Sequence, residues 1–408
     1  MVYISSGRIR RPVELSSLFP LQQHLEDLKD KNLYRHLRTL ESAQGPWVTL
    51  EGRQVLNLCS NNYLGLSSHP RVIEAATEAI QQWGCGSGAS RLICGNLSLH
   101  EVLESRLAAF KGTEAALLYN SGYTANGGII SALVDREDFV FSDELNHASI
   151  IDGCRLSQAR VMVFPHNGME ALEDKLRWAL SSKHSAKRLI VVDGVFSMDG
   201  DLAPLPDLVN LAERYECMLM VDEAHATGVL GPGSRGAAAH FGVEERIPIL
   251  MGTLSKALGC FGGFVAGSRD LVSFLINTSR SLIYTTALPP VVVATGLAAL
   301  DVLNADPSLP VKVQENGHYL RSQLNRLGYN TLNSKTQIIP VVIGDASRTL
   351  EMSRLLLREG VFATPIRPPT VPEGTCRIRI TVMATHTRED LDFAVKALER
   401  TGHTLGVI

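Results

Sequence analysis

The chain has 408 residues, of which 45% are hydrophobic and 20% charged, and this length predicts a large domain and a smaller one. The net charge is −3 and no basic run is longer than Arg8-Ile9-Arg10-Arg11, which excludes bulk binding to nucleic acid or to anionic membranes. No uncharged apolar run reaches about 18 residues, which excludes a membrane-spanning segment. The seven cysteines are scattered without a C-x-x-C pair, which favours free thiols in a reducing cytoplasm over a disulfide framework or a metal site.

Strands and helices are predicted to alternate along most of the chain. Residues 14–43 mix polar and apolar positions, as an amphipathic arm does. Short apolar runs then predict strands at 115–119, 139–141, 161–164, 189–193, 218–222 and 247–252, with helices between them, for example at 171–180 and 204–215. Because such an alternation is typical of a mainly parallel sheet covered on both faces, we expect an α/β fold. Residues 262–267 predict one further strand, either an antiparallel edge strand or a neighbour.

The pattern changes after Pro289-Pro290. A helical stretch at 291–303 and about 311–327 leads into predicted strands at 338–343, 360–366 and 376–382, with helices at about 347–359 and 387–401. This order predicts an α+β domain at the C-terminal end. We therefore expect an N-terminal arm at 1–57, a large domain at 58–300 and a small domain at 301–408.

Lys256 follows the predicted strand at 247–252, in the run Thr253-Leu254-Ser255-Lys256-Ala257-Leu258-Gly259. Ligands of open α/β sheets bind at the carboxyl ends of the strands. A lysine that small residues bring into partly desolvated surroundings can lose its proton and attack a carbonyl carbon. An ordinary exposed lysine is the more frequent explanation of a single lysine, so the hypothesis depends on the neighbouring motifs.

Three more motifs follow predicted strands. Asn120-Ser121-Gly122-Tyr123 opens a helix, where backbone N–H groups can bind an anion, although a plain turn has the same composition. Val221-Asp222-Glu223-Ala224-His225 has the letters of a helicase motif, but the chain lacks the G-x-x-x-x-G-K-[ST] loop that this function needs. Its acid and its histidine could instead contact an aromatic nitrogen and the adjacent hydroxyl. His147 follows a further strand, and a lone histidine there is usually structural.

Acidic and basic residues toward the C-terminal end complete the candidate set. Phe196-Ser197-Met198-Asp199-Gly200-Asp201 follows a strand, and its acids do not have the spacing of an EF-hand calcium loop. Arg367, Arg377 and Arg379 are candidates for binding a carboxylate through paired guanidinium hydrogen bonds. Residues two apart in a strand share a face, so Arg377 and Arg379 are expected to point the same way. At least one of these arginines is expected to form an ordinary ion pair.

Together these motifs match the needs of pyridoxal 5′-phosphate, which are an imine-forming lysine, a carboxylate for the pyridine nitrogen, a ring-stacking group and N–H donors for phosphate. The chain resembles the α-oxoamine synthase family of fold-type I pyridoxal-phosphate enzymes, the aspartate aminotransferase-like transferases. The resemblance runs from Ser60-Asn61-Asn62-Tyr63-Leu64-Gly65 to the C-terminal end and includes His-Ala-Ser at 147–149, Val-Phe-Ser-Met-Asp-Gly-Asp at 195–201 and Asp-Glu-Ala-His at 222–225. A non-catalytic partner subunit is disfavoured because Lys256 and Asp222 are both present.

The resemblance implies catalytic and cofactor-binding roles. Lys256 would hold the cofactor and then remove the α-proton of the amino acid, and Asp222 would pair with the pyridine nitrogen. His147 would stack on the ring, while His225 and Ser197 would hydrogen-bond the ring oxygen. The remaining cofactor-binding residues would be Gly122, Tyr123 and Thr253, with Thr253 on the phosphate, and Thr286, which would reach the phosphate of a neighbouring subunit. No metal is implied.

The resemblance also implies how the substrates are held. Arg379, together with Arg367, would bind the carboxylate of the amino acid, and Arg35 on the arm would meet the acyl substrate. The other substrate-binding residues would be Asn61 and Thr370. A second copy of the chain would complete a homodimer with shared active sites.

The implied reaction is a condensation of a small amino acid with an acyl thioester, followed by loss of carbon dioxide. Residues 282–290 and 366–372 resemble members that join L-alanine to a pimeloyl thioester in biotin synthesis, whereas residues 401–408 resemble glycine C-acetyltransferases, which use glycine and acetyl-coenzyme A. We give more weight to the first two segments because they line the implied site. Coenzyme A and a carrier protein both stay open as the carrier of the acyl group.

Overall fold

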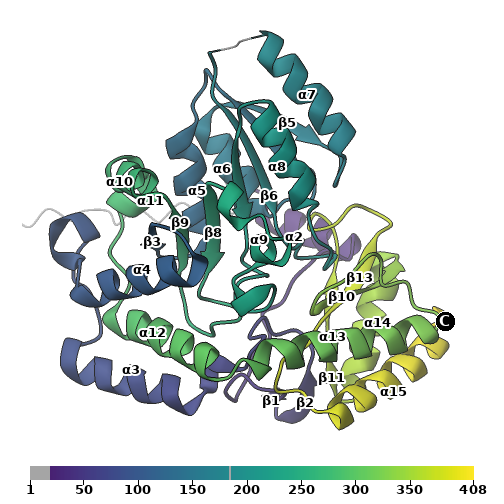
Figure 1. The fold of residues 1–408 in the computed structure, drawn as a ribbon. Helices are drawn as coiled ribbons and strands as arrows, with labels where there is room; N and C mark the ends of the chain where they lie inside the picture. The colour runs from purple at the N-terminus through teal and green to yellow at the C-terminus, as the bar shows by residue number, and fades with distance from the viewer. Residues whose placement is uncertain (1–18, 183–184) are drawn as a thin grey trace, which may run out of the picture.

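The computed structural model describes residues 19–182 and 185–408, and its central feature is a seven-stranded sheet (Figure 1). The strand order is β3-β9-β8-β7-β6-β4-β5. The strands are β3 (Ala115–Tyr119), β4 (Phe139–Asp143), β5 (Arg160–Phe164), β6 (Arg188–Asp193), β7 (Met218–Asp222), β8 (Ile249–Thr253) and β9 (Gly263–Gly267). β9 runs antiparallel to both of its neighbours, and the remaining neighbouring pairs are parallel. The predicted mainly parallel sheet is therefore confirmed.

Helices cover both faces of this sheet because its strands carry apolar side chains on both sides. Leu189 and Val191 of β6 belong to one buried cluster, whereas Ile190 and Val192 belong to another. The helices of the first cluster are α5 (Gly122–Leu133), α6 (Ala148–Ser157), α10 (Arg269–Thr278) and α11 (Arg280–Ile283). The second cluster includes residues of α4 (Ser98–Lys111), α7 (Met169–Ser182), α8 (Leu205–Arg214), α9 (Ala237–His240) and α12 (Pro290–Ala305), and it extends into helices nearer the C-terminus. α3 (Pro70–Trp83) lies alongside α12 (Figure 1).

Two three-stranded sheets form the C-terminal part. One is antiparallel, with β13 (Cys376–Thr381) between β10 (Ile338–Gly344) and β12 (Thr364–Ile366). The other joins the hairpin of β1 (Trp47–Leu50) and β2 (Arg53–Asn57) to the parallel strand β11 (Val361–Phe362). The helices of this part are α13 (Ser308–Arg326), α14 (Ala346–Arg358) and α15 (Arg388–Leu405).

The strand expected at 360–366 is in fact two strands, β11 and β12, which belong to different sheets. They separate at Ala363, whose carbonyl oxygen accepts a hydrogen bond from Ser353 Oγ of α14 (2.8 Å). That carbonyl is therefore bonded to a helix side chain, and the chain passes from one sheet to the other at this point. An apolar run alone does not reveal such a change of sheet.

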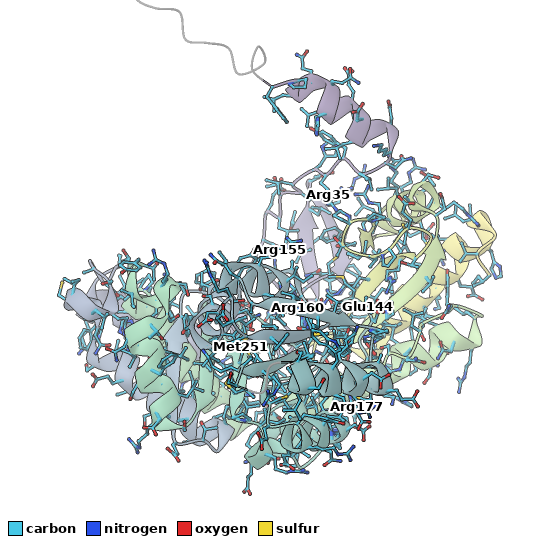
Figure 2. All side chains as sticks on the ribbon, turned by 90° about the horizontal axis from the view of Figure 1, so that it is seen from above. Arg35, Glu144, Arg155, Arg160, Arg177 and Met251 are labelled. Atoms are coloured by element: carbon cyan, nitrogen blue, oxygen red, sulfur yellow. The ribbon has the colours of Figure 1, made fainter. Side chains whose placement is uncertain are left out.

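The division into an arm, a large domain and a small domain stays a proposal. The pairing of β2 shows that the end of the expected arm belongs to a sheet of the C-terminal part. β2 ends at Asn57, where the arm was expected to end, yet it pairs with β11 of the C-terminal part. α2 (Leu21–Asp30) has no buried residue and stands apart from the rest of the molecule (Figure 2), while residues 1–18 of the expected arm lie outside the described residues. Among the described helices, none combines the length and apolar character that crossing a membrane requires.

The parallel strands bring polar end residues to one edge of the large sheet. Asp193 at the end of β6 lies opposite Asp222 at the end of β7, and the next strand, β8, ends at Thr253. β4, on the other side of β6, ends at Asp143. Since the carboxyl ends of parallel strands meet at the same edge, the motifs that follow these strands are brought together in space.

Candidate active site

A cavity of about 180 Å³ lies at this carboxyl edge, and most of the predicted cofactor-binding residues line it. These are Gly122, Tyr123, His147, Asp222, His225, Thr253 and Lys256. Met251, which Figure 2 labels, is another lining residue. A larger cleft of about 950 Å³ between α3 and α12 contains none of the predicted site residues.

Lys256 lies in the bend that follows β8 and is partly buried. Burial lowers the pKa of its ammonium group, and the nearby carboxyl groups of Asp222 and Asp193 oppose this effect without reversing it. A lowered pKa increases the fraction of neutral amine, which is the nucleophilic and basic form. The position is therefore suited to attack on a carbonyl and to proton abstraction.

Asp222 is a buried carboxylate at the end of β7, with an exposed fraction of 4%. Its Oδ1 accepts a hydrogen bond from the Ala224 N–H (2.9 Å), and its Oδ2 accepts one from Asn126 Nδ2 (2.8 Å). Hydrogen bonds of this kind fix the orientation of the carboxyl group. Such a group can hold a proton on an aromatic nitrogen.

His147 is placed by the neighbouring strand β6. Its backbone N–H donates to Asp193 Oδ2 (2.7 Å), and its ring Nδ1 contacts Ser149 Oγ (2.7 Å) at the start of α6. Burial raises the pKa of Asp193 well above its usual range, and Asp222 beside it adds to the effect. The ring of His147 remains exposed and lines the cavity, so one face is available to a bound aromatic group.

His225 is held by residues that are distant in the sequence. Its ring Nδ1 lies 2.6 Å from the hydroxyl oxygen of Tyr63, and its backbone carbonyl accepts a hydrogen bond from Gln337 Nε2 (2.8 Å). Burial lowers the pKa of His225 well below its usual range, and the charges of Lys256 and Arg379 lower it further. The ring is therefore neutral at physiological pH.

The start of α5 and the end of β8 form one end of the cavity. Ser121 Oγ accepts from the Thr124 N–H (3.1 Å), which leaves the N–H groups of Gly122 and Tyr123 at the open end of the helix. A side chain on Gly122 would place its Cβ 2.6 Å from Thr253 Cγ2, so this close approach requires glycine. Within the described part of the chain, the buried Thr253 Oγ1 has no hydrogen-bond partner. This end can accept a phosphate.

The arginines of β13 share one face of the strand, as expected, because both reach the loop at 195–201. Arg379 Nε donates to the Ser197 carbonyl (2.6 Å), and its two Nη atoms lie 3.3 Å from Asn61 Oδ1. Arg377 instead forms an ion pair with Asp199. At least one of the arginines was expected to form an ordinary ion pair, and Arg377 does so. Arg379 remains the candidate for carboxylate binding.

Several predicted site residues do not line this cavity. Arg367, which is buried, donates to the Asn32 carbonyl, and the exposed Arg35 donates to the Pro368 carbonyl (3.3 Å). The Thr370 N–H donates to the Arg367 carbonyl (3.1 Å), so these residues form a group between the arm and the segment that follows β12. Figure 2 shows Arg35 on the arm, apart from Met251.

The remaining predicted site residues also lie outside the cavity lining, and these are Asn61, Ser197, Thr286 and Arg379. Thr286 is exposed, and its carbonyl accepts a hydrogen bond from Asn120 Nδ2 (2.8 Å), next to the start of α5. Ser197 is buried, and its carbonyl binds Arg379.

The structure adds residues that the sequence did not single out. Asn126, Ser149 and Asp193 line the cavity, and Tyr63 and Gln337 hold His225. Asp193 is the last residue of the predicted strand at 189–193, so the rule that ligands bind at the carboxyl ends of strands could have indicated it. The contacts of Tyr63 and Gln337 with His225 span 162 and 112 residues of sequence, and no local pattern indicates them.

The chain is similar to known proteins over nearly its whole length. The family described as aminotransferase class I and II matches residues 53–398. An 8-amino-7-oxononanoate synthase of Geobacter sulfurreducens is 53% identical over 386 residues, which are 94% of this chain and 98% of that protein. One of Thermoanaerobacter pseudethanolicus is 50% identical over 388 residues, which are 95% of this chain and 98% of that protein.

Two solved structures are similar in fold. A serine palmitoyltransferase of S. paucimobilis with a bound PLP–myriocin aldimine has a TM-score of 0.91 and 32% identity, and covers 97% of this chain and 100% of its own. An 8-amino-7-oxononanoate synthase of Francisella tularensis has a TM-score of 0.74 and 26% identity, and covers 87% of this chain and 99% of its own.

Proposed function

The chain belongs to the aminotransferase class I and II family, and we propose that it joins L-alanine to a pimeloyl thioester to give 8-amino-7-oxononanoate, carbon dioxide and a free thiol. Relatives of that name share about half of their residues with this chain over nearly their whole length, whereas the serine palmitoyltransferase shares 32%. The fold is the expected fold-type I of pyridoxal-phosphate transferases. The observation that carries the proposal is the cavity that Lys256, Asp222 and His147 line together.

The residues of the cavity fit pyridoxal 5′-phosphate. Thr253 Oγ1, which is buried without a partner among the described residues, and the N–H groups at the start of α5 suit a phosphate. The fixed carboxylate of Asp222 suits the ring nitrogen, and the amine of Lys256 suits the aldehyde carbon. When bound, this cofactor supplies an electron-withdrawing ring that stabilises negative charge on the α-carbon of an amino acid.

Each remaining role belongs to a residue of this chain. Lys256 would take the proton from the α-carbon of alanine, which its lowered pKa favours because the amine is then more often neutral. Asp222 would keep a proton on the ring nitrogen, and His147 would cover one face of the ring. His225, with Ser197, would hydrogen-bond the ring oxygen, while Tyr123 and Gly122 would border the ring and the phosphate.

The two substrates would be held by separate arginines. Arg379 is anchored by Ser197 and Asn61, and its charge acts on both Lys256 and His225, so we assign the carboxylate of alanine to it. Arg367 is buried, its Nε has no hydrogen-bond partner among the described residues, and its charge repels that of Arg35. A carboxylate between these two guanidinium groups would relieve the repulsion. We assign the far carboxylate of the pimeloyl group to Arg35 and Arg367, with Thr370 beside them.

A homodimer with shared active sites would cover apolar surface that the single chain leaves exposed. α2 buries no residue, and the side chains of Phe19 and Leu25 are 46% and 43% exposed. The side chains of Ile93 and Tyr284 are 78% and 72% exposed, and Tyr284 is close in sequence to the exposed Thr286. A second copy seated here would bring Thr286 to the phosphate of its partner. The seven unpaired cysteines support the cytoplasmic location expected from the sequence.

A panel of substrate pairs tests the proposed activity. The purified enzyme with pyridoxal 5′-phosphate is mixed with alanine, glycine or serine, and then with pimeloyl-, acetyl- or palmitoyl-coenzyme A, while thiol release is followed. The proposal predicts the highest kcat/KM for alanine with the pimeloyl thioester. A higher value for glycine with acetyl-coenzyme A would instead support the activity that residues 401–408 resemble.

A further inference from the structure

Tyr63 connects the predicted carboxylate-binding group to His225. It is fully buried, and its hydroxyl oxygen lies 2.6 Å from His225 Nδ1 and 3.1 Å from Asn61 Oδ1. Asn61 Oδ1 is also the atom that both Nη atoms of Arg379 approach, at 3.3 Å. The contacts form one continuous series from Arg379 through Asn61 and Tyr63 to the ring of His225.

The hydroxyl of Tyr63 has only one hydrogen to donate, and two acceptors lie beside it, His225 Nδ1 and Asn61 Oδ1. The side chains of Arg379 and Gln337 form further hydrogen bonds with this hydroxyl. If it donates to His225 Nδ1, the ring proton of His225 is on Nε2, the nitrogen that remains for the cavity. If it donates to Asn61 Oδ1, it must accept from His225 Nδ1–H, and Nε2 then carries no proton. Burial keeps Tyr63 protonated by raising its pKa and keeps His225 neutral by lowering its pKa, so the choice lies between these two arrangements.

Two contacts favour donation to His225. The Tyr63–His225 distance is the shorter of the two, 2.6 Å against 3.1 Å. Asn61 Oδ1 is already approached by the charged guanidinium of Arg379, which makes it a weaker acceptor for a further donor. Gln337 Nε2 holds the backbone carbonyl of His225 at 2.8 Å and so keeps the ring within reach of Tyr63.

We propose that Tyr63 is a positioning residue that keeps the proton of His225 on Nε2, and that Arg379 controls this through Asn61. The inference rests on the proposed function to the extent that His225 must donate a hydrogen bond to the ring oxygen of the cofactor. A substrate carboxylate that draws Arg379 away from Asn61 makes Asn61 a better acceptor for Tyr63. Binding of the amino acid at Arg379 is thereby coupled to the proton on His225.

The ¹⁵N signals of the His225 ring test this directly. The enzyme is labelled with ¹⁵N-histidine and loaded with pyridoxal 5′-phosphate, and His225→Gln identifies the signals by their loss. The wild type is expected to show the Nε2–H form. In Tyr63→Phe the ratio of Nε2–H to Nδ1–H falls about fivefold, as expected for the loss of one hydrogen bond. Tyr329→Phe, which removes another buried hydroxyl bonded to the Leu398 carbonyl, leaves the ratio unchanged.

A pair of variants separates this coupling from a merely structural role. Arg379→Ala should shift the ratio toward Nδ1–H, because Tyr63 then has a free acceptor in Asn61. Adding Asn61→Ala to Arg379→Ala removes that acceptor and should restore the Nε2–H form. An unchanged ratio in Tyr63→Phe, an unchanged ratio in Arg379→Ala, or no restoration in the double variant overturns the proposal. None of these measurements requires turnover, so failure of the substrate panel would contradict the proposed function separately.

Discussion

The reactivity assigned to Lys256 results from opposing influences on one amine. Burial lowers the pKa of the ammonium group, while Asp222 and Asp193 raise it, and burial has the larger effect. Asp193 is itself held with a raised pKa by burial and by Asp222, which reduces the negative charge that it presents to Lys256. The arrangement therefore places the carboxyl group of Asp222 for the ring nitrogen and gives Lys256 an ammonium group that releases its proton readily.

Lys256→Ala should abolish covalent attachment of the cofactor and nearly all turnover, because no other amine lines the cavity within the described residues. The measurement is reduction with borohydride, followed by proteolysis and mass spectrometry to locate the reduced cofactor–lysine adduct. Lys335→Ala, at an exposed lysine outside the cavity, is the control and should retain the adduct at Lys256. An adduct that maps to a different lysine in the wild type would remove this role from Lys256.

At the scale of structural elements, His166 joins the end of β5 to the loop at 195–201. Its Nδ1 lies 3.1 Å from Asp143 Oδ1, and its Nε2 lies 2.8 Å from Asp201 Oδ2. Burial lowers the pKa of His166, but the hydrogen bonds and charges of Asp143 and Asp201 outweigh it and raise the pKa to about 9. The same loop provides the Ser197 carbonyl that accepts a hydrogen bond from Arg379. The contact of His166 with Asp201 therefore holds in place the loop that anchors Arg379.

The ion pair of His166 should make stability dependent on pH. Because its folded pKa of about 9 exceeds the unfolded value of 6.5, its contribution is fully present below pH 6.5 and is lost as the pH rises through about 9. The difference in unfolding free energy between wild type and His166→Asn should therefore shrink by about 3 kcal/mol across that range. Denaturant unfolding at pH 6 and pH 9.5 measures it, and equal differences at both values would show that His166 is not charged in the folded protein.

The two arginine groups should affect different substrates. Arg379→Ala should raise the KM for alanine about ten- to a hundredfold, since a charge-assisted hydrogen bond contributes about 1.5–3 kcal/mol. Arg367→Ala should instead reduce the preference for pimeloyl- over octanoyl-coenzyme A, which lacks the far carboxylate. Steady-state kinetics of both variants with both thioesters decide this, with the absorbance of the bound cofactor as a check on folding. If Arg367→Ala raises the KM for alanine while Arg379→Ala does not, the two assignments are reversed.

The order of elements could be predicted from the sequence, but the contacts between distant elements could not. Continuous apolar runs gave the strands from β3 to β9, and the strand-end rule placed Lys256 and Asp222 at one edge. The β1–β2 hairpin was not predicted, because its longest apolar runs, Trp47-Val48 and Val55-Leu56, are only two residues long and its pairing partner β11 lies far along the chain. Likewise, the contact of Asn61 with Arg379 spans 318 residues, and only the folded chain reveals it.

At the scale of the whole molecule, the proposed homodimer predicts that active sites are shared between subunits. Dimers of Lys256→Ala and of Thr286→Asp should each be nearly inactive, the second because a carboxylate would repel the phosphate of the partner's cofactor. Mixed dimers should recover activity, since the Lys256→Ala subunit supplies an intact Thr286 to a partner that retains Lys256. Activity after unfolding and refolding the two variants together, compared with each refolded alone, measures this. Inactive mixed dimers would contradict shared sites.

The proposed reaction joins alanine to a pimeloyl group with loss of the alanine carboxylate as carbon dioxide. Alanine labelled with ¹³C either at the carboxyl carbon or at the methyl carbon is incubated with pimeloyl-coenzyme A and the enzyme, and the product is analysed by mass spectrometry. The expected product is 8-amino-7-oxononanoate that retains the methyl label and has lost the carboxyl label. A product that keeps the carboxyl label, or the absence of any product that contains the alanine methyl carbon, would contradict it.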